Sequence, residues 1–264
     1  MTMKKFGVLG NPVTHSLSPK MFNAGFESQN FEGVYEFCDI LPEEFNCFMK
    51  KVRTGEYAGL SVTVPYKEQV IEHCDELSDE AKKIGAVNCL YIKEGKLIGT
   101  NTDWFGFAES LKEVVEEVSS LKVLIFGAGG AAKACIYALN LEGVSPFVTN
   151  RTMSKVEGLA EDFDINVIEQ DLLVDLEFDL IVNATSVGLT ETDELIVPIE
   201  LLAKASVVLD LIYLKTPLVE AAEEYGLKLI DAKRMLLLQG VLQYSIFTGV
   251  EAPKEKMWNS INQT

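Results

Sequence analysis

The sequence predicts an α/β protein made of two domains. Short apolar runs alternate with longer stretches of helical period from end to end, which is typical of βαβ units and a largely parallel sheet. The 264 residues, 48% of them hydrophobic, can bury one large core or two smaller ones. The βα alternation breaks near Trp104 and a new series of strands follows, so we expect a domain boundary there.

The first part of the chain contains three apolar runs that predict strands: Lys5–Leu9, Val34–Ile40 and Leu60–Val64. Helices are expected from Pro19 and Pro42, because proline suits a first helical turn, and a further helix from about Tyr66. Two more strands, Val87–Lys93 and Leu97–Thr100, form a predicted hairpin. Its turn is Glu94-Gly95-Lys96, where glycine tolerates positive φ.

The second part begins with a helix over about Trp104–Val118 and continues with five strands, predicted at Leu121–Phe126, Pro146–Thr149, Asp179–Ala184, Val207–Leu211 and Leu227–Ile230. The last helices, Met235–Thr248 and Pro253–Ile261, follow the final strand without another β partner. We therefore expect them to pack back on the first domain. The predicted domains are residues 1–104 with 235–264, and residues 105–234.

Composition excludes several function classes. The formal charge of −17 describes a surface that repels phosphate backbones and anionic lipid, so neither nucleic acid nor a membrane is an expected partner. Two histidines exclude a histidine-rich metal site, and we predict no metal. Five cysteines, odd in number and without a C-x-x-C pair, indicate a reducing compartment, and the first ten residues are too short for a secretory signal. We expect a cytoplasmic protein.

A glycine-rich segment follows the first strand of the second domain. Gly127, Gly129 and Ala132 fit G-x-G-x-x-A between a strand and a helix, where missing side chains let a pyrophosphate approach the helix N-terminus. A glycine-rich turn without a ligand is the alternative. The next strand ends in Asn150-Arg151-Thr152 with Lys155 one turn on, where an NAD enzyme would place a carboxylate. These donors suit a 2′-phosphate and indicate NADP, although a solvated basic pair remains the alternative.

Hydroxyl, ammonium, amide and carboxylate groups follow the strands of the first domain. Ser16 and Ser18 come after the first strand. Considered by itself, Ser18 is typical of a helix N-cap before Pro19. Thr63 and Lys67 follow the third strand, and the segments Gly85-Ala86-Val87-Asn88 and Asn101-Thr102-Asp103 flank the hairpin. Ligands of open α/β sheets bind at the carboxyl ends of strands, so these positions favour a binding site over solvated side chains.

At this point the sequence resembles the shikimate dehydrogenase family over essentially its whole length. Nine segments in order carry the resemblance: Ser16-Leu17-Ser18-Pro19, Val62-Thr63-Val64-Pro65-Tyr66-Lys67, Gly85-Ala86-Val87-Asn88, Asn101-Thr102-Asp103, Gly127-Ala128-Gly129-Gly130-Ala131, Asn150-Arg151-Thr152, Asn183-Ala184-Thr185-Ser186-Val187-Gly188-Leu189, Asp210-Leu211-Ile212-Tyr213 and Met235-Leu236-Leu237-Leu238-Gln239.

The resemblance implies an NADP-dependent oxidoreductase that reduces 3-dehydroshikimate to shikimate in chorismate and aromatic amino acid biosynthesis. It implies a substrate domain built from both ends of the chain and a Rossmann domain between them. Lys67 and Asp103 would be the catalytic pair. The implied substrate-binding residues are Ser16, Ser18, Thr63, Asn88, Tyr213 and Gln239. The implied cofactor-binding residues are Gly127, Ala128, Gly129, Gly130, Ala131, Asn150, Arg151, Thr152, Lys155, Thr185 and Leu211.

The chain departs from the family pattern at two places. Ser61 stands where the family usually has Asn, and Ala232 lies in the segment where it usually has Gly ahead of Met-Leu. The first exchanges an amide for a shorter hydroxyl near the site, and the second replaces a backbone that can approach the nicotinamide closely with one carrying a β-carbon. Selectivity between shikimate and quinate is also left open. A quinate or other cyclic hydroxy-acid dehydrogenase, even one using NAD, is therefore the alternative. A non-catalytic NADP-binding regulator is the alternative of another class. A monomer or a homodimer is expected.

Overall fold

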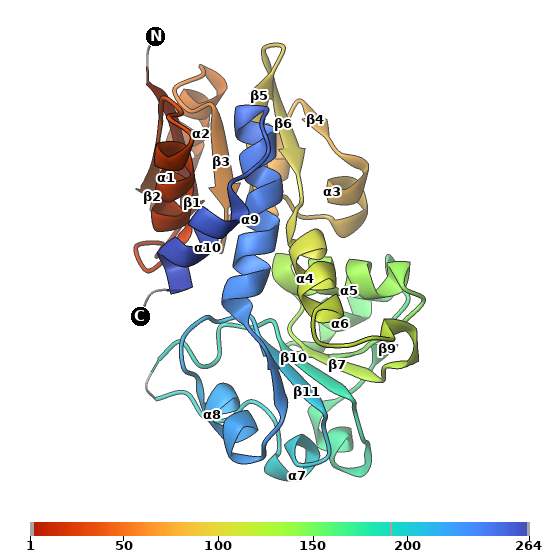
Figure 1. Ribbon diagram of the computed structural model, residues 1–264. Helices are drawn as coiled ribbons and strands as arrows, with labels where there is room; N and C mark the ends of the chain where they lie inside the picture. The colour runs from red at the N-terminus through yellow and green to blue at the C-terminus, as the bar shows by residue number, and fades with distance from the viewer. Residues whose placement is uncertain (1–2, 191, 263–264) are drawn as a thin grey trace. The chain divides into compact units, whose positions relative to one another are not determined.

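The computed structural model of the chain describes residues 3–190 and 192–262 (Figure 1). Within it the chain forms two compact units, one comprising Met1–Gly106 with Leu236–Thr264 and the other comprising Phe107–Met235. Each unit contains one six-stranded sheet. The predicted α/β fold is confirmed.

The first unit is built on the strands β1 (Lys4–Gly10), β2 (Gly33–Asp39), β3 (Gly59–Val62), β4 (Glu76–Leu77), β5 (Cys89–Lys93) and β6 (Lys96–Thr100). They lie in the order β2-β1-β3-β5-β6-β4. The sheet is parallel from β2 to β3, β5 runs antiparallel to both β3 and β6, and β4 pairs parallel with β6. β5 therefore begins at the edge where β3 ends.

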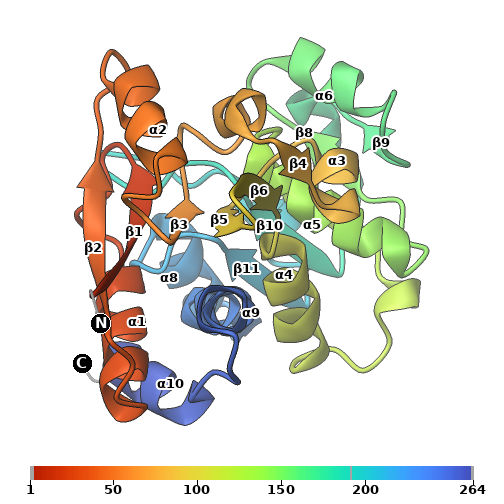
Figure 2. The same cartoon turned by 90° about the horizontal axis from the view of Figure 1, so that it is seen from above.

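Helices cover both faces of this sheet (Figure 2). One face packs on α2 (Phe45–Arg53) and α3 (Asp79–Ile84), through a core that includes Phe45, Met49 and Ala81. The other face packs on α1 (Ser18–Ser28), α9 (Ala232–Thr248) and α10 (Lys254–Asn262). In that second core the N-terminal Phe22 and the C-terminal Tyr244 stack with ring centroids 6.2 Å apart. The predicted return of the C-terminal helices to the first domain is confirmed.

The second unit has the strands β7 (Val123–Phe126), β8 (Phe147–Thr149), β9 (Asn166–Val167), β10 (Leu180–Asn183), β11 (Val207–Asp210) and β12 (Lys228–Ile230). They form a wholly parallel sheet in the order β12-β11-β10-β7-β8-β9. Its helices are α4 (Asp103–Lys112), which starts in the first unit, α5 (Gly130–Leu141), α6 (Met153–Leu159), α7 (Ile199–Leu202) and α8 (Pro217–Glu224). This doubly wound order is that of a dinucleotide-binding sheet.

The predicted strands agree with the observed ones to within about two residues, because apolar runs bounded by turns mark buried strands. The hairpin turn is tight, with φ of 53° at Glu94 and 76° at Gly95, and Lys93 pairs with Lys96. The helix expected from Tyr66 is wrong: the chain forms only a 3₁₀ turn at Gln69–His73. The backbone N–H of Val87 donates to the Lys67 carbonyl at 2.7 Å, so a tertiary contact takes the acceptor that a helix starting at Tyr66 would use.

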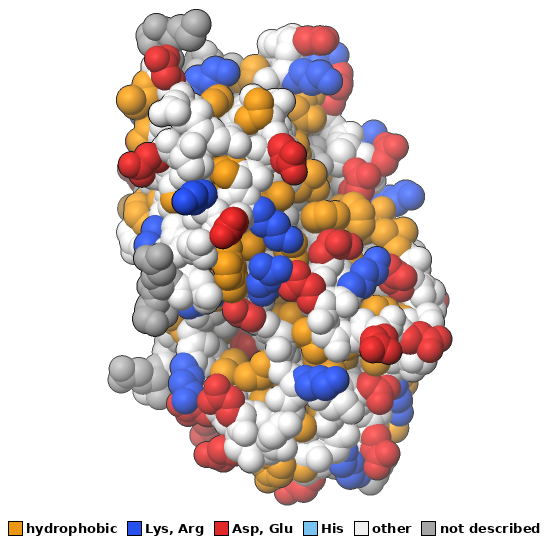
Figure 3. All heavy atoms as spheres, viewed as in Figure 1, with side chains coloured by type: hydrophobic (Ala, Val, Ile, Leu, Met, Phe, Trp, Pro, Cys, Tyr) orange, Lys and Arg blue, Asp and Glu red, His pale blue; other side chains and the backbone are white. Residues whose placement is uncertain are grey.

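Acidic side chains are spread over the face drawn in Figure 3, with basic ones among them, as the net charge of −17 requires. Among the described residues no helix is both long enough and apolar enough to cross a lipid bilayer. Residues Val123–Leu141 form strand β7, a glycine turn and helix α5, in agreement with the strand and the helix predicted on either side of the glycine-rich segment.

Candidate active site

Several predicted site residues lie at one edge of the first unit's sheet. β1 and β3 end there, since Leu9 pairs with Val62, and β5 begins there beside the end of β6, since Cys89 pairs with Thr100. The segments that follow β1, β3 and β6, and the residue before β5, therefore meet at this edge. They carry Ser16, Ser18, Thr63, Lys67, Asn88 and Asp103.

Lys67 and Asp103 form an ion pair at this edge, with 2.6 Å between Lys67 Nζ and Asp103 Oδ2. The lysine lies in the loop after β3, and the aspartate is the first residue of α4. Only 13% and 11% of the two side chains are exposed. The Asp103 backbone N–H donates to Asn101 Oδ1 at 2.9 Å, which fixes the start of the helix. The ammonium is thus held at the surface of the site by a partner that is itself anchored.

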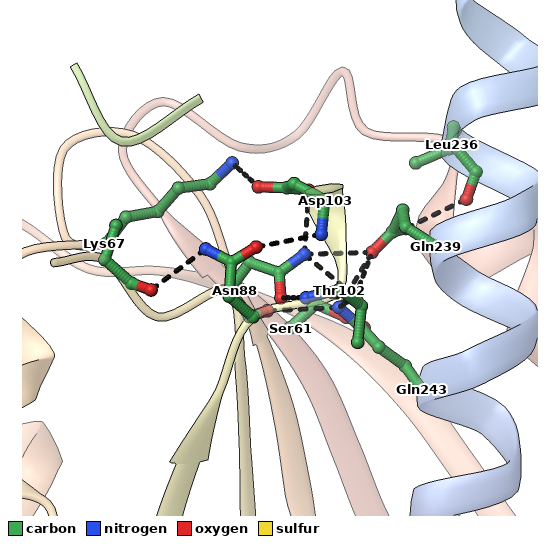
Figure 4. Close-up of polar contacts among 10 residues, drawn as sticks. Ser61, Lys67, Asn88, Thr102, Asp103, Leu236, Gln239 and Gln243 are labelled. Atoms are coloured by element: carbon green, nitrogen blue, oxygen red, sulfur yellow. Dashed lines mark hydrogen bonds and ion pairs between the residues drawn. The ribbon is translucent and has the colours of Figure 1, made fainter. Parts of the chain in front are cut away.

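Two amides adjoin this pair, as Figure 4 shows. Asn88 Nδ2 donates to Asp103 Oδ1 at 2.7 Å and to Gln239 Oε1 at 3.2 Å. Asn88 Oδ1 accepts from the Thr102 backbone N–H at 2.7 Å. Gln239 comes from α9, so the C-terminal part of the chain contributes a side chain to a site built by the N-terminal part. Lys67, Asp103, Asn88 and Gln239 are therefore brought together.

Sequence reasoning missed Gln243, which lies one helical turn after Gln239. Its side chain is fully buried, and Nε2 donates to Gln239 Oε1, Thr102 Oγ1 and the Asn88 carbonyl, at 2.7, 3.0 and 3.1 Å. Its Oε1 accepts from the hydroxyl of Ser61, the residue that departs from the family pattern. The spacing of four residues on one helix was the available signal, since such residues share a face.

Ser18 is not the N-cap of helix α1, in contrast to the interpretation from the sequence. Helix α1 begins at Ser18, and the Ser18 side chain makes no capping bond. Instead the Ser18 backbone N–H donates to Ser16 Oγ at 3.2 Å. Ser18 is buried and Ser16 and Thr63 are half-buried. The Thr63 backbone N–H donates to the Leu9 carbonyl at 2.8 Å, which ties the segment after β3 to the end of β1.

In the second unit the glycine loop joins β7 to α5 and has the backbone that the motif predicts. Gly127 has φ +122°, and a β-carbon there would lie 2.8 Å from the Ala184 carbonyl oxygen. Gly129 immediately precedes α5, is exposed, and no atom lies within 4 Å of where its β-carbon would be. Gly130 and Ala131 begin the helix and Ala128 is buried. The loop thus has an open approach to a helix N-terminus, which fits a bound pyrophosphate.

The basic segment after β8 lies in the same unit. Arg151, Thr152 and Lys155 are exposed, and Asn150 Nδ2 donates to the Thr152 carbonyl at 3.1 Å. The Gly127 backbone N–H donates to the Thr149 carbonyl at 2.9 Å, so this segment starts beside the glycine loop. The two segments therefore lie next to each other at the same end of this sheet.

A buried pair, Asn183 and Asp210, holds two further loops at this end of the sheet. Asn183 Oδ1 accepts from the Thr185 hydroxyl at 2.7 Å, and Asn183 Nδ2 donates to both carboxylate oxygens of Asp210 at 3.1 Å. Asp210 also accepts from the Ile212 backbone N–H at 3.0 Å and from the Thr216 hydroxyl at 2.7 Å. Burial raises the pKa of Asp210. One pair therefore fixes the loop with Thr185 and the loop with the half-buried Leu211 and Tyr213.

The departure at Ala232 places an ordinary residue at the start of α9. The Lys233 backbone N–H donates to Asp231 Oδ1 at 2.8 Å, which caps this helix. Among the described residues, no group of three or more histidine, cysteine or acidic side chains is arranged to hold a metal ion. The chemistry available is an anchored ammonium with amides beside it in one unit, and a dinucleotide loop in the other.

Three family models match the chain. They are the shikimate dehydrogenase substrate binding domain over residues 8–90, the shikimate / quinate 5-dehydrogenase model over residues 109–220 and the shikimate 5′-dehydrogenase C-terminal domain over residues 234–261. A curated relative from Aquifex aeolicus, named shikimate dehydrogenase (NADP(+)), is 43% identical over 94% of this chain and 92% of its own length.

Solved structures of similar proteins agree with the family models. The shikimate 5-dehydrogenase of Thermus thermophilus, determined with NADP(H) and shikimate, is 37% identical with a TM-score of 0.88 and covers 98% of both chains. The 5-ketofructose reductase of a Gluconobacter species, in a ligand-free form, is 29% identical with a TM-score of 0.81 and covers 99% of both chains. With models that match both units and a relative this similar along its length, the chain belongs to the shikimate dehydrogenase family.

Proposed function

We propose that this chain catalyses the reversible reduction of 3-dehydroshikimate to shikimate with NADPH. The observation that carries the proposal is the nearly buried pair of Lys67 and Asp103 flanked by the amides of Asn88 and Gln239. The names of the relatives, shikimate dehydrogenase (NADP(+)), support the same reaction.

In this reaction a negative charge develops on the ketone oxygen of the substrate. The Lys67 ammonium stabilises that charge and donates a proton to the oxygen, and in the reverse direction the amine accepts the proton from the hydroxyl. Asp103 holds the ammonium and accepts a hydrogen bond from a ring hydroxyl. NADP supplies or receives the hydride when bound. The protein's own task is orientation and electrostatic stabilisation.

The remaining substrate contacts are assigned by family membership and local placement. Ser16 and Ser18 bind the carboxylate, while Thr63, Asn88, Tyr213 and Gln239 surround the ring hydroxyls. The first unit is the substrate domain. For the cofactor, the glycine loop of residues 127–131 binds the pyrophosphate, Asn150, Arg151, Thr152 and Lys155 bind the 2′-phosphate end, and Thr185 and Leu211 complete the site.

The test is an assay in which the purified chain is mixed with shikimate and NADP, and the absorbance of the NADPH formed is monitored. We expect turnover that saturates in both substrates. Absence of NADPH formation at high enzyme concentration, with NADP binding retained, would instead support a non-catalytic NADP-binding regulator.

A second candidate is a dehydrogenase of quinate or another cyclic hydroxy acid. Two observations favour it: Ser61 stands beside the site in place of the usual asparagine, and a full-length structural relative carries the name of a reductase of another compound. Comparing kcat/KM for shikimate and quinate with NADP and NAD separates the two candidates. We further propose a cytoplasmic enzyme, as the odd cysteine number suggests, acting as a monomer or homodimer without nucleic acid or membrane partners.

A further inference from the structure

A continuous series of buried hydrogen bonds joins Tyr35, on the edge strand β2, to the candidate catalytic pair. The Tyr35 hydroxyl donates to Ser61 Oγ, and the Ser61 hydroxyl donates to Gln243 Oε1. The exposed fractions are 2% for Tyr35, 6% for Ser61 and 0% for Gln243. None of the three is a predicted substrate contact, so the binding of shikimate does not by itself explain them.

The direction of these bonds is fixed by the Asn88 backbone carbonyl, which can only accept and takes a hydrogen bond from Gln243 Nε2 at 3.1 Å. At the other end the Tyr35 hydroxyl donates to Ser61 Oγ, and burial raises the pKa of Tyr35, so this hydroxyl keeps its proton. Ser61 Oγ accepts that proton's hydrogen bond and directs its own proton to Gln243. The oxygen of the Gln243 amide must then face Ser61, and the nitrogen must face the other way.

That orientation matches the two amides beside the catalytic pair, of which Asn88 is also held by the Thr102 backbone N–H. Gln243 Nε2 donates to Gln239 Oε1, so the oxygen of Gln239 faces inward while its nitrogen donates to the Leu236 carbonyl at 2.9 Å. Gln239 Oε1 then accepts from Asn88 Nδ2, which also donates to Asp103 Oδ1. Reversing the Asn88 amide would place its oxygen against a carboxylate, and reversing Gln239 would place two amide nitrogens together (Figure 4).

We infer that Tyr35, Ser61 and Gln243 are positioning residues that hold the amides of Gln239 and Asn88 in the orientation they present to the substrate. The inference rests on the proposed function, in which those two amides contact ring hydroxyls. It also explains the serine at position 61. A single hydroxyl oxygen accepts from Tyr35 and donates to Gln243, whereas an asparagine would place two more heavy atoms in this buried space.

The first test compares two tyrosine variants in the same core. Tyr35 and Tyr244 are both buried and both stack on Phe22, but the Tyr244 hydroxyl donates to Gln29 at 2.9 Å, away from this network. We expect Tyr35→Phe to raise the KM for shikimate about three- to tenfold with the KM for NADP unchanged, because one hydrogen bond is lost. Tyr244→Phe should change neither KM by more than about twofold.

The second test is Gln243→Glu, an isosteric change that places a carboxylate oxygen against the three oxygens to which Nε2 donates. We expect kcat/KM for shikimate to fall about tenfold or more at pH 8 and to recover toward the wild-type value as the pH is lowered, because a protonated glutamate again donates. The other ionisable groups that face this network are Tyr35, Cys38, Cys89, Lys67 and Asp103. They are the same residues in wild type and variant, so the quantity compared at each pH is the ratio of variant to wild-type activity.

Equal effects of Tyr35→Phe and Tyr244→Phe, or a Gln243→Glu ratio that does not change with pH, would overturn the inference while leaving the proposed function intact. A wild-type enzyme without activity on shikimate or quinate would instead remove the proposed function, and this inference with it. Circular dichroism melting of each variant establishes that a kinetic change is measured on folded protein.

Discussion

Lys67 Nζ lies 2.6 Å from Asp103 Oδ2 although the two residues are 36 positions apart, one in the loop after β3 and the other at the start of α4. An exposed ion pair contributes little to stability, but this one is nearly nine-tenths buried and has the amide of Asn88 on its carboxylate. Such a pair keeps an ammonium in one place. That is the requirement for stabilising a developing oxyanion.

The first prediction is that Lys67→Ala lowers kcat by about 10²- to 10⁴-fold, because the variant loses the proton donor and the positive charge together. The affinity for NADP should stay within about twofold of wild type. Steady-state kinetics and NADP titration by calorimetry measure the two quantities. Lys96→Ala is the control, since Lys96 also forms an ion pair in this unit, with Glu76, but at an exposed position. Unchanged kcat in Lys67→Ala would remove the lysine from the mechanism.

The second prediction contrasts two glycines of the cofactor loop. Gly127→Ala should lower the unfolding free energy by about 1 to 3 kcal/mol, because alanine resists a φ of +122° and its β-carbon would contact the Ala184 carbonyl. Gly129→Ala should leave the stability of the free protein within about 0.5 kcal/mol, since its surroundings are open. It should nevertheless weaken NADP binding about tenfold or more, because a methyl group then meets the pyrophosphate.

Urea unfolding without ligand and calorimetric NADP titration measure these effects separately. NADP binding by Gly129→Ala with the wild-type dissociation constant would contradict the assignment of this loop to the pyrophosphate. A wild-type unfolding free energy for Gly127→Ala would contradict the strain argument.

The sequence predicts the sheets better than it predicts the site. Val8 and Leu9, or Ile125 and Phe126, belong to apolar runs whose burial is a local property, so the strands can be predicted from them. The side chains after Tyr66 favour a helix, but the Lys67 carbonyl is bonded to Val87, a contact 20 residues away. Helix α3 is not predicted because it has only six residues, although the Ser78 hydroxyl caps it.

The motif residues of the site can be recognised one segment at a time, but their mutual arrangement cannot. Gln243 contacts Ser61 across 182 residues of sequence, and nothing local marks either as part of a polar network. Asn183 and Asp210 lie within recognisable motifs, yet their pairing depends on β10 and β11 being neighbours in the sheet. Long-range register, which sequence patterns do not encode locally, determines these contacts.

The third prediction concerns cofactor choice. Arg151→Ala should raise the dissociation constant for NADP about tenfold or more while leaving that for NAD nearly unchanged, because only NADP carries the 2′-phosphate. Lys155→Ala should act in the same direction. The control is Lys204→Ala in the same unit, where the lysine pairs with Glu177 at 3.5 Å and should affect neither cofactor. Equal losses for NADP and NAD would show that Arg151 contacts the shared part of the dinucleotide or only supports the fold.

The last prediction is a pH dependence of stability with a defined sign. Burial raises the pKa of Asp210, so between the ordinary pKa and the raised one the folded protein keeps a proton that the unfolded chain releases. The contribution of Asp210 to the unfolding free energy is therefore largest below this window and is lost as the pH rises through it. Asparagine does not titrate, so the difference between wild type and Asp210→Asn should be larger at pH 4 than at pH 8.

Asp193→Asn in the same unit is the control with the opposite sign. Hydrogen bonds from the backbone N–H groups of Thr190 and Gly188 lower the pKa of Asp193, so its contribution is present at neutral pH and is lost as the pH falls through the lowered pKa. Urea unfolding of wild type and both variants, at pH 4 and pH 8, measures the two differences. The contrary outcome is an Asp210→Asn difference that also shrinks on acidification. Asp210 would then be charged in the folded protein throughout this range and would hold the two loops as a carboxylate, not as a protonated carboxyl group.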